Sequence, residues 1–453
     1  MQRRGFIKLS LVLSSVVLMP QYTYANTLDI SQIEFSSEIY AENNAQTIII
    51  FMYGGASQLS GNLTNIEDIK KNSQSNYDYF RGITKTENSC WKEAGGKYME
   101  ELIADGDMTI FRCCYSKVRE DANIKAHGVC TEQNQKGTFD DNAAGIFTNL
   151  AQVLEGNGVV TQDSLMPFVT MESDSTFFVE GDKSLSAYLK PIGINEKFDN
   201  PYSRDVRSWL YYTQDEREID GYNSKDNGFD PALDTTMDKI AQSNNQPGKI
   251  KDAFSKRASI SQFIEDISSV QTPDLGENRY PSNDFSPKIE AAVKLLGANP
   301  DTKVITLGTG GLGGWDDHND ARDYVSRMDN LFSSLKSAMA HIKALGKEDS
   351  INIMVFAEFG RNVNLNLANG WDHGNLQNLY VLGGKGYFNH KGIVGETILE
   401  NTGSLNRLWL KPKKDTYWFE PNSIAATLYK IYGIQNPTIL TDGYDVIEPL
   451  FDT

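Results

Sequence analysis

Apolar residues along the chain gather in six short runs. They are Thr47 to Met52, Met108 to Phe111, Met166 to Thr170, Lys303 to Leu307, Ile351 to Phe356 and Asn378 to Leu382. Within each run the apolar residues are nearly continuous instead of alternating with polar ones. Such runs are typical of strands that are covered on both faces, so we predict six buried strands.

Helical periodicity separates several of these runs. In the segment from about Asp320 to Leu345, apolar side chains recur every three or four residues. They are Tyr324, Met328, Leu331, Leu335, Ile342 and Leu345. A second helix is predicted from Ser423 to Tyr432, with Gly433 ending it. Strands that alternate with helices predict an α/β fold with a mostly parallel sheet.

The stretch from about 173 to 287 has a different texture, because apolar runs thin out and polar, aromatic and glycine-rich segments dominate. We interpret it as an insertion or helical cap on one large domain. Within it, Asp220 to Asp230 superficially resembles a calcium loop but lacks the regular donor spacing and the terminal glutamate. A solvated loop is the better interpretation.

The first 25 residues have the layout of an export leader. A basic start with Arg3, Arg4 and Lys8 precedes an uncharged stretch from Leu9 to Met19, which is too short to span a bilayer permanently. The paired arginines and Gly5 to Lys8 resemble the twin-arginine signal. We expect cleavage after Ala25, export through the twin-arginine machinery, and a mature chain of residues 26–453 in the periplasm or outside the cell, without stable membrane insertion.

Charge narrows the choice of partners. The chain has 43 Lys and Arg against 60 Asp and Glu, a net charge of −17, which becomes −20 once the three cations of the leader are removed. Such an acidic chain argues against nucleic acid or an anionic membrane surface as the main partner. Its 40% hydrophobic content is enough for one large core or two smaller ones.

Candidate chemistry is concentrated in two loops that follow predicted strands. After Lys303 to Leu307 comes a glycine-rich loop with Asp316 and His318, and after Ile351 to Phe356 come Glu358, Arg361 and then Asp372 and His373. Ligand sites of open α/β sheets form where such loops converge. Carboxylate and imidazole donors in glycine-rich turns suit a divalent metal, with zinc, manganese, iron and calcium all open.

The four cysteines, Cys90, Cys113, Cys114 and Cys130, lie within about forty residues of one another. In an oxidising compartment they permit two disulfides, and a zinc site is the rival interpretation, although the paired spacing of cysteine zinc sites is missing.

These motifs also resemble a known family. The sequences GGWDDH, AEFGR and GWDHG, the GGASQ loop after the first strand and the twin-arginine leader are similar to exported proteins grouped as domain of unknown function 1501. The resemblance implies a three-layer sandwich of the alkaline phosphatase and sulfatase type.

What the resemblance implies for the site is a metal centre formed by Asp316, His318 and His373. Glu358 would be a carboxylate of a second metal site and Asp372 would lie in or next to the ligand shell. Arg361 would grip an anionic ester, with a structural ion pair as the equal alternative. His127 matches a family segment that lines the pocket, although a surface or core histidine is nearly as well supported.

The first loop departs from the family pattern, because Ser60 stands where related sequences have a metal-binding aspartate. Ser57 and Ser60 are candidate nucleophiles, with turn formation as the alternative for both. Two functions follow. The first is a metal-dependent hydrolase of phosphate or sulfate esters, on an anionic small molecule or a glycan. The second is a catalytically degenerate binding or structural protein that keeps a partial metal site, with Trp209 to Tyr222 as a binding segment.

Overall fold

The computed structural model describes residues 30–71, 77–172, 175–181, 185–199, 249–401 and 407–452. The leader, the segment Asp220 to Asp230 and the segment Trp209 to Tyr222 lie outside these residues, so the predictions about them stay predictions. None of the described helices combines the length and the apolarity needed to cross a lipid bilayer.

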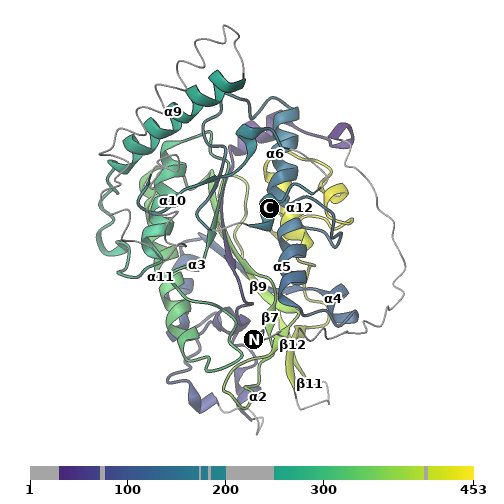
Figure 1. Cartoon of the computed structure of the whole chain (residues 1–453). Coiled ribbons are helices and arrows are strands. Elements are labelled where there is room, and N and C mark those ends of the chain that lie inside the picture. The colour runs from purple at the N-terminus through teal and green to yellow at the C-terminus, as the bar shows by residue number, and fades with distance from the viewer. Residues whose placement is uncertain are drawn as a thin grey trace, which may run out of the picture.

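A central eight-stranded sheet organises the described chain (Figure 1). Every pair of neighbouring strands is parallel except the two that involve β9. In spatial order the strands are β10 (Gly392–Val394), β2 (Met108–Tyr115), β9 (Leu376–Gly383), β6 (Ile351–Ala357), β1 (Gln46–Met52), β5 (Val304–Gly308), β3 (Phe168–Thr170) and β4 (Ile192–Gly193). All six predicted strands are therefore confirmed, and so is the mostly parallel sheet.

Helices cover both faces of the sheet, which makes a three-layer sandwich (Figure 1). One face carries α3 (Gly96–Ala104), α9 (Lys249–Ser268), α10 (Ser286–Ala298) and α11 (Asp323–Ala344), and the other carries α5 (His127–Lys136), α6 (Ile146–Gly156) and α12 (Asn422–Ile431). The predicted helices correspond to α11 and α12, and Gly433 follows α12 at a φ of +92°. Shorter helices are α1 (Ser37–Asn43), α2 (Ile66–Lys71) and α4 (Lys117–Asp121).

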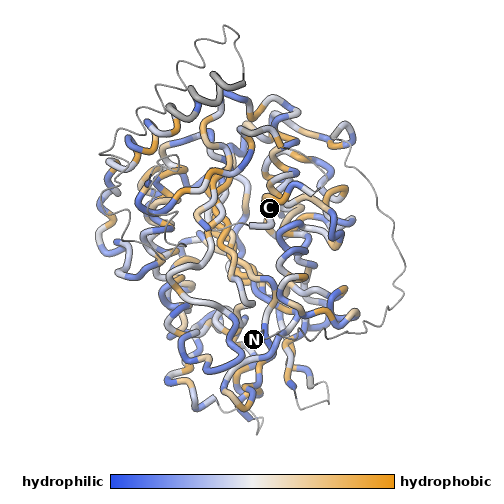
Figure 2. The backbone as a smooth tube through the Cα atoms, viewed as in Figure 1, coloured by the Kyte–Doolittle hydropathy of each residue, from blue (hydrophilic) through white to orange (hydrophobic). Residues whose placement is uncertain are grey.

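The near-continuous apolar pattern of β1 has a direct physical cause. Ile48 and Ile50 belong to the hydrophobic cluster on one face of the sheet, whereas Ile49 and Phe51 belong to the cluster on the other. Successive side chains of a strand point to opposite faces, so a strand covered on both sides must be apolar at every position. Figure 2 shows these hydrophobic strands running through the middle of the molecule.

The stretch from about 173 to 287 adds described elements to both the sheet and a helical layer. Strand β4 pairs with β3 at the edge of the sheet, and α9 lies beside α10. The strand β4 and the helix α9 of this stretch therefore extend the sheet and the helical layer that covers it.

The pairing register of β1 with β5 and β6 brings together the strand ends that precede the candidate site residues. Phe51 of β1 lies opposite Gly308 of β5 and Phe356 of β6. The loops that follow these three strands therefore leave the sheet at the same edge. Two short strands, β7 (Gly360–Arg361) and β8 (His373–Gly374), pair antiparallel just beyond this edge. A hairpin of β11 (Thr397–Asn401) and β12 (Leu408–Pro412) completes the strands.

Candidate metal centre

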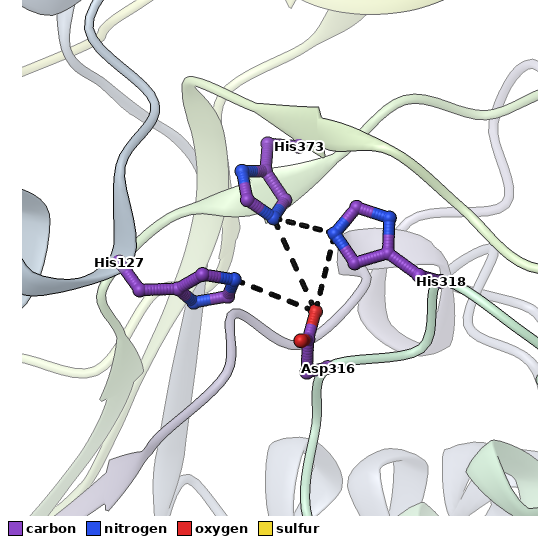
Figure 3. A group of neighbouring side chains, drawn as sticks. All are labelled: His127, Asp316, His318 and His373. Atoms are coloured by element: carbon purple, nitrogen blue, oxygen red, sulfur yellow. Dashed lines mark hydrogen bonds and ion pairs between the residues drawn. The ribbon is translucent and has the colours of Figure 1, made fainter. Parts of the chain in front are cut away.

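Four side chains converge at the carboxyl edge of the sheet (Figure 3). Asp316 and His318 come from the loop after β5, His373 from β8 and His127 from the first position of α5. One potential ligand atom of each residue lies within 4.8 Å of the others. Three of the five histidines of the chain thus meet at one point.

The spacing of these atoms is close to that of side chains that share one divalent ion. Asp316 Oδ1 lies 3.3 Å from His318 Nε2, 3.5 Å from His127 Nε2 and 4.0 Å from His373 Nε2. The two Nε2 atoms of His318 and His373 are 2.7 Å apart. Ligands about 2.05 Å from a tetrahedral zinc ion lie about 3.3 Å from one another. The four distances lie on both sides of this value, so the four atoms are near enough to share one ion without forming a regular tetrahedron.

Partners behind two of the rings turn their Nε2 atoms toward the centre. His373 Nδ1 lies 2.5 Å from the carbonyl oxygen of Lys125, and His127 Nδ1 lies 2.5 Å from Glu358 Oε1. Since a carbonyl or carboxylate oxygen can only accept, each Nδ1 donates its proton, and in the neutral form of either ring the lone pair is then on Nε2. Burial, followed by the charge of Arg361, lowers the pKa of His373 to about 4, so this ring is neutral at pH 7.

Glu358 lies behind His127, away from the convergent atoms. Its side chain is buried, and Oε1 also accepts a hydrogen bond of 3.0 Å from the backbone N–H of Gly54. Oε2 accepts from the Thr131 hydroxyl, one helical turn after His127 on α5. The structure thus places Glu358 in contact with a histidine and outside the group of four convergent residues, where the sequence suggested a ligand of a second metal.

Asp372 has the corresponding place behind His318. Its Oδ1 lies 3.5 Å from His318 Nδ1, and its Oδ2 lies 2.8 Å from the guanidinium of Arg407. Asp372 is therefore next to the ligand shell and not among the four convergent residues.

Arg361 acts as a clamp between loops. It is fully buried, and its nitrogens donate to the carbonyl oxygens of Gly54, Gly55, Trp315 and Trp371. Nη2 also lies 2.8 Å from Asp316 Oδ1. Every guanidinium nitrogen is engaged within the protein, so the geometry matches the structural ion pair and gives no support to a grip on an anionic ester.

The ion pair also fixes the charge state of Asp316. Burial raises the pKa of this carboxyl, but Arg361, with His318 and His127, more than offsets burial, and the pKa lies below its ordinary value. Asp316 is consequently ionised at neutral pH and offers a negatively charged oxygen.

The two candidate nucleophiles are engaged elsewhere. Ser60 is fully buried, and its hydroxyl donates a hydrogen bond of 2.6 Å to the carbonyl oxygen of Ala94. The Ser57 hydroxyl accepts from the N–H of Leu59 at the start of a short 3-10 helix, and its side chain is buried as well. The turn-forming alternative therefore describes Ser57, whereas Ser60 ties its loop to Ala94. Neither serine reaches the four convergent residues through a contact in the described structure.

Gly54 is required by the close approach of two loops. Its φ is +105°, and a Cβ placed on it would lie 2.5 Å from the backbone nitrogen of Asp316. Any side chain here would push Asp316 away and strain the backbone. The glycine after the first strand thus sets the position of the carboxylate.

The predicted disulfides are not formed, because all four cysteines are free, buried thiols. Cys90 belongs to the hydrophobic cluster on one face of the sheet and Cys114 to the cluster on the other, so the sheet separates them. Burial raises the pKa of Cys90 to about 11 and that of Cys113 to about 12, which leaves these thiols unreactive at neutral pH. The four cysteines therefore belong to the buried interior of the protein.

Sequence reasoning left His127 undecided and did not find Thr131 or Lys125. The available signal for Thr131 was its helical spacing of four residues from His127, which places both side chains on one face of α5. No sequence pattern could reveal Lys125, since it contributes only its backbone carbonyl.

No protein-family model matches the chain, and no curated protein matches it in sequence. Among solved structures it is similar to the C-terminal periplasmic domain of EcEptC from Escherichia coli in complex with zinc, with a TM-score of 0.39, 10% identity and coverage of 93% of this chain and 91% of that one. It is also similar to alkaline phosphatase from the Antarctic bacterium TAB5, with a TM-score of 0.34, 14% identity and coverage of 85% and 98%. A third is the phosphonate monoester hydrolase of Silicibacter pomeroyi, with a TM-score of 0.33, 14% identity and coverage of 90% and 76%.

Replacing Glu358 by glutamine is expected to weaken zinc binding about 10- to 100-fold, because the amide no longer fixes the His127 ring through a charged acceptor. Asp372→Asn should have a smaller effect of at most about tenfold, since Asp372 lies 3.5 Å from His318 and also pairs with Arg407. Competition titration with a chromogenic chelator measures both. Equal affinities for Glu358→Gln and the unmodified protein would contradict the orienting role.

Proposed function

We propose that the protein is an exported, metal-dependent hydrolase of phosphate or sulfate esters. The observation that carries this proposal is the convergence of three imidazole nitrogens and one carboxylate oxygen at the carboxyl edge of an α/β sheet. Hydrogen-bonding partners hold two of the rings from behind, and Asp372 lies beside the third. Export is inferred from the leader in the sequence, and membership of the family with domain of unknown function 1501 is inferred from the motifs.

The donor set favours zinc, or iron or manganese, over calcium. Three imidazoles and one carboxylate suit borderline metals, whereas calcium takes six to eight oxygen ligands. Among the described residues only this one group of acidic and histidine side chains could hold an ion. The proposal therefore requires a single metal, held by His127, Asp316, His318 and His373, that keeps a further position open for water or the ester.

A bound divalent ion would supply Lewis acidity and lower the pKa of water. The chain's own residues prepare for this. His373 is neutral and presents a lone pair, Glu358 accepts the Nδ1 proton of His127, and Arg361 holds Asp316 ionised. Because the hydroxyls of Ser57 and Ser60 are engaged in the protein, we assign the nucleophile to water.

Protein purified through its export route and loaded with zinc or manganese is expected to hydrolyse an aryl phosphate or an aryl sulfate. Because water is the nucleophile, the Ser57→Ala variant should keep kcat within about threefold of the unmodified protein. Release of nitrophenol measures both rates. Loss of activity in Ser57→Ala, with normal metal content, would instead assign the nucleophile to this serine.

A second candidate function is a degenerate protein whose metal site supports structure. The observation that favours it is that the position of the missing aspartate, Ser60, is buried against Ala94 and offers no second carboxylate. In this case, zinc removal lowers the melting temperature but no ester of the panel is hydrolysed. Turnover that disappears with the metal would exclude it.

A further inference from the structure

Phe359 lies in the short connection between β6 and β7, directly after Glu358. Its side chain is buried, with 1% exposed. The centroid of the phenyl ring lies 4.4 Å from that of the His373 ring, at 36° between the planes, and 5.0 Å from that of the His127 ring, at 50°. The two imidazole rings, drawn in Figure 3, meet edge to face at 4.4 Å. The phenyl ring thus packs against two of the four convergent side chains.

The loop after β1 also packs against the phenyl ring. Gly55 has a φ of +77°, and a Cβ placed on it would lie 2.3 Å from Cε2 and 2.4 Å from Cδ2 of Phe359. The guanidinium carbon of Arg361 lies 5.5 Å from the centre of the ring, and Arg361 Nε donates to the carbonyl oxygen of Gly55 at 2.6 Å. The absence of a side chain at Gly55 therefore makes room for the ring beside the two histidines.

Packing by Phe359 adds to what the hydrogen bonds of the two histidines do. Glu358 holds Nδ1 of His127, and the carbonyl oxygen of Lys125 holds Nδ1 of His373. Each of these bonds fixes one atom of an imidazole and constrains the plane of the ring less. A flat aromatic ring in contact with both imidazoles limits how far their planes can turn. The direction of both Nε2 atoms therefore depends on Phe359.

Solvent exposure differs among the convergent side chains. The side chain of Asp316 is 52% exposed, whereas that of His373, the nearer of the two imidazoles to the phenyl ring, is 19% exposed. In the described part of the chain no ring contact joins Phe359 to His318, so the phenyl ring covers the side formed by His127 and His373. The open side of the group is the side of Asp316.

We propose that Phe359 is a positioning residue of the metal centre. Its ring fixes the planes of His127 and His373 so that both Nε2 atoms point at one ion, and it keeps water away from the ion on this side. The inference rests on the metal centre of the proposed function and deepens it, because the position for water or the ester is then left on the side of Asp316.

Zinc affinity, measured by competition with a chromogenic chelator, tests this role. Phe359→Leu keeps an apolar side chain but loses the flat ring, and it should raise the Kd for zinc about tenfold. The matched control is Phe147→Leu, since Phe147 on α6 is also fully buried and packs against Phe177 and Phe178. The same change of side chain in this part of the core should leave the Kd for zinc unchanged.

Cobalt(II) in place of zinc reports on the ligands around the ion. Cobalt(II) absorbs visible light more strongly when it has four ligands than when it has five or six, so entry of further water weakens its bands. The bands should be weaker in Phe359→Leu than in the unmodified protein and unchanged in Phe147→Leu. A general loss of packing would not produce this difference between the two variants.

Gly55→Ala is a second variant, which leaves Phe359 in place. Its methyl group meets the phenyl ring and should push it against the histidines, which raises the Kd for zinc about tenfold. In the Phe359→Leu background the more flexible side chain gives way, so Gly55→Ala should raise the Kd by at most about threefold. Backbone strain at the φ of +77° is present in both backgrounds and cancels in the comparison.

Three outcomes overturn the inference. They are unchanged zinc affinity and cobalt bands in Phe359→Leu, an equal loss of affinity in Phe147→Leu, and an equal effect of Gly55→Ala with and without the phenyl ring. Circular dichroism checks that the variants are folded.

The same measurements separate this inference from the proposed function. If the unmodified protein binds neither zinc nor cobalt, both are rejected. Metal binding that depends on Phe359, without turnover of any ester, would support the positioning role and reject the hydrolase. Ester turnover that needs the metal, with unchanged zinc affinity in Phe359→Leu, would support the hydrolase and reject the positioning role.

Discussion

His318→Ala and His373→Ala are each expected to lower zinc affinity by more than about a hundredfold and to abolish ester hydrolysis. Each substitution removes one of four convergent donors and leaves three, in a site where His318 Nε2 and His373 Nε2 lie only 2.7 Å apart. Elemental analysis of dialysed protein should find about one zinc per chain in the unmodified protein and a small fraction of that in either variant.

The matched control is His341→Gln. This histidine lies on α11, where its Nδ1 pairs with the hydroxyl of Tyr280 at 3.1 Å, and a glutamine can keep a hydrogen bond there. Its zinc content should equal that of the unmodified protein. If His318→Ala and His373→Ala also retain full zinc after dialysis, the four residues do not form the metal site.

Most of the fold could be predicted from the sequence, and β1 shows why. Ile48 and Ile49 must be apolar because they face different hydrophobic clusters, and this leaves a continuous run that is easy to read. Strand β4 was missed because a two-residue edge strand, Ile192–Gly193, has too few positions to form a pattern.

The candidate site could be predicted only in part from the sequence. Asp316, His318 and His373 follow predicted strands, so topology alone brings their loops together. Residue type alone could not separate ligands from their supports: Glu358 and Asp372 are carboxylates like Asp316, yet each lies behind a histidine. Ser60 likewise shows its burial against Ala94 only once the chain is folded.

The second large effect that we expect is a pH-dependent change in stability, and it comes from Glu172. It follows β3, and both of its carboxylate oxygens are buried without a hydrogen-bond partner in the described structure. Burial raises the pKa of Glu172 to about 7 from its ordinary value of 4.5, and the neighbouring Tyr53, Thr306 and Ser175 side chains offset only part of this. Below pH 7 the folded protein therefore holds a neutral carboxyl here.

The sign of the pH dependence follows from this raised pKa. Between pH 4.5 and 7 the unfolded chain has lost the Glu172 proton and the folded protein keeps it, so folding takes up a proton and stability falls as pH rises. Above pH 7 the folded protein carries the buried charge, and the cost levels off at about 3 kcal/mol. Glu172→Gln removes the charge and with it this cost.

The free energy of unfolding of Glu172→Gln should therefore exceed that of the unmodified protein by up to about 3 kcal/mol at pH 8, and the difference should shrink toward zero at pH 5. Urea titrations at the two pH values measure it, and other titrating groups cancel in the comparison of the two proteins. Glu67→Gln, at an exposed glutamate of α2, should show no such change with pH. If the difference in unfolding free energy between Glu172→Gln and the unmodified protein is the same at pH 5 and pH 8, Glu172 titrates as an ordinary surface carboxyl. Only a carboxyl that its buried surroundings keep protonated makes this difference change with pH.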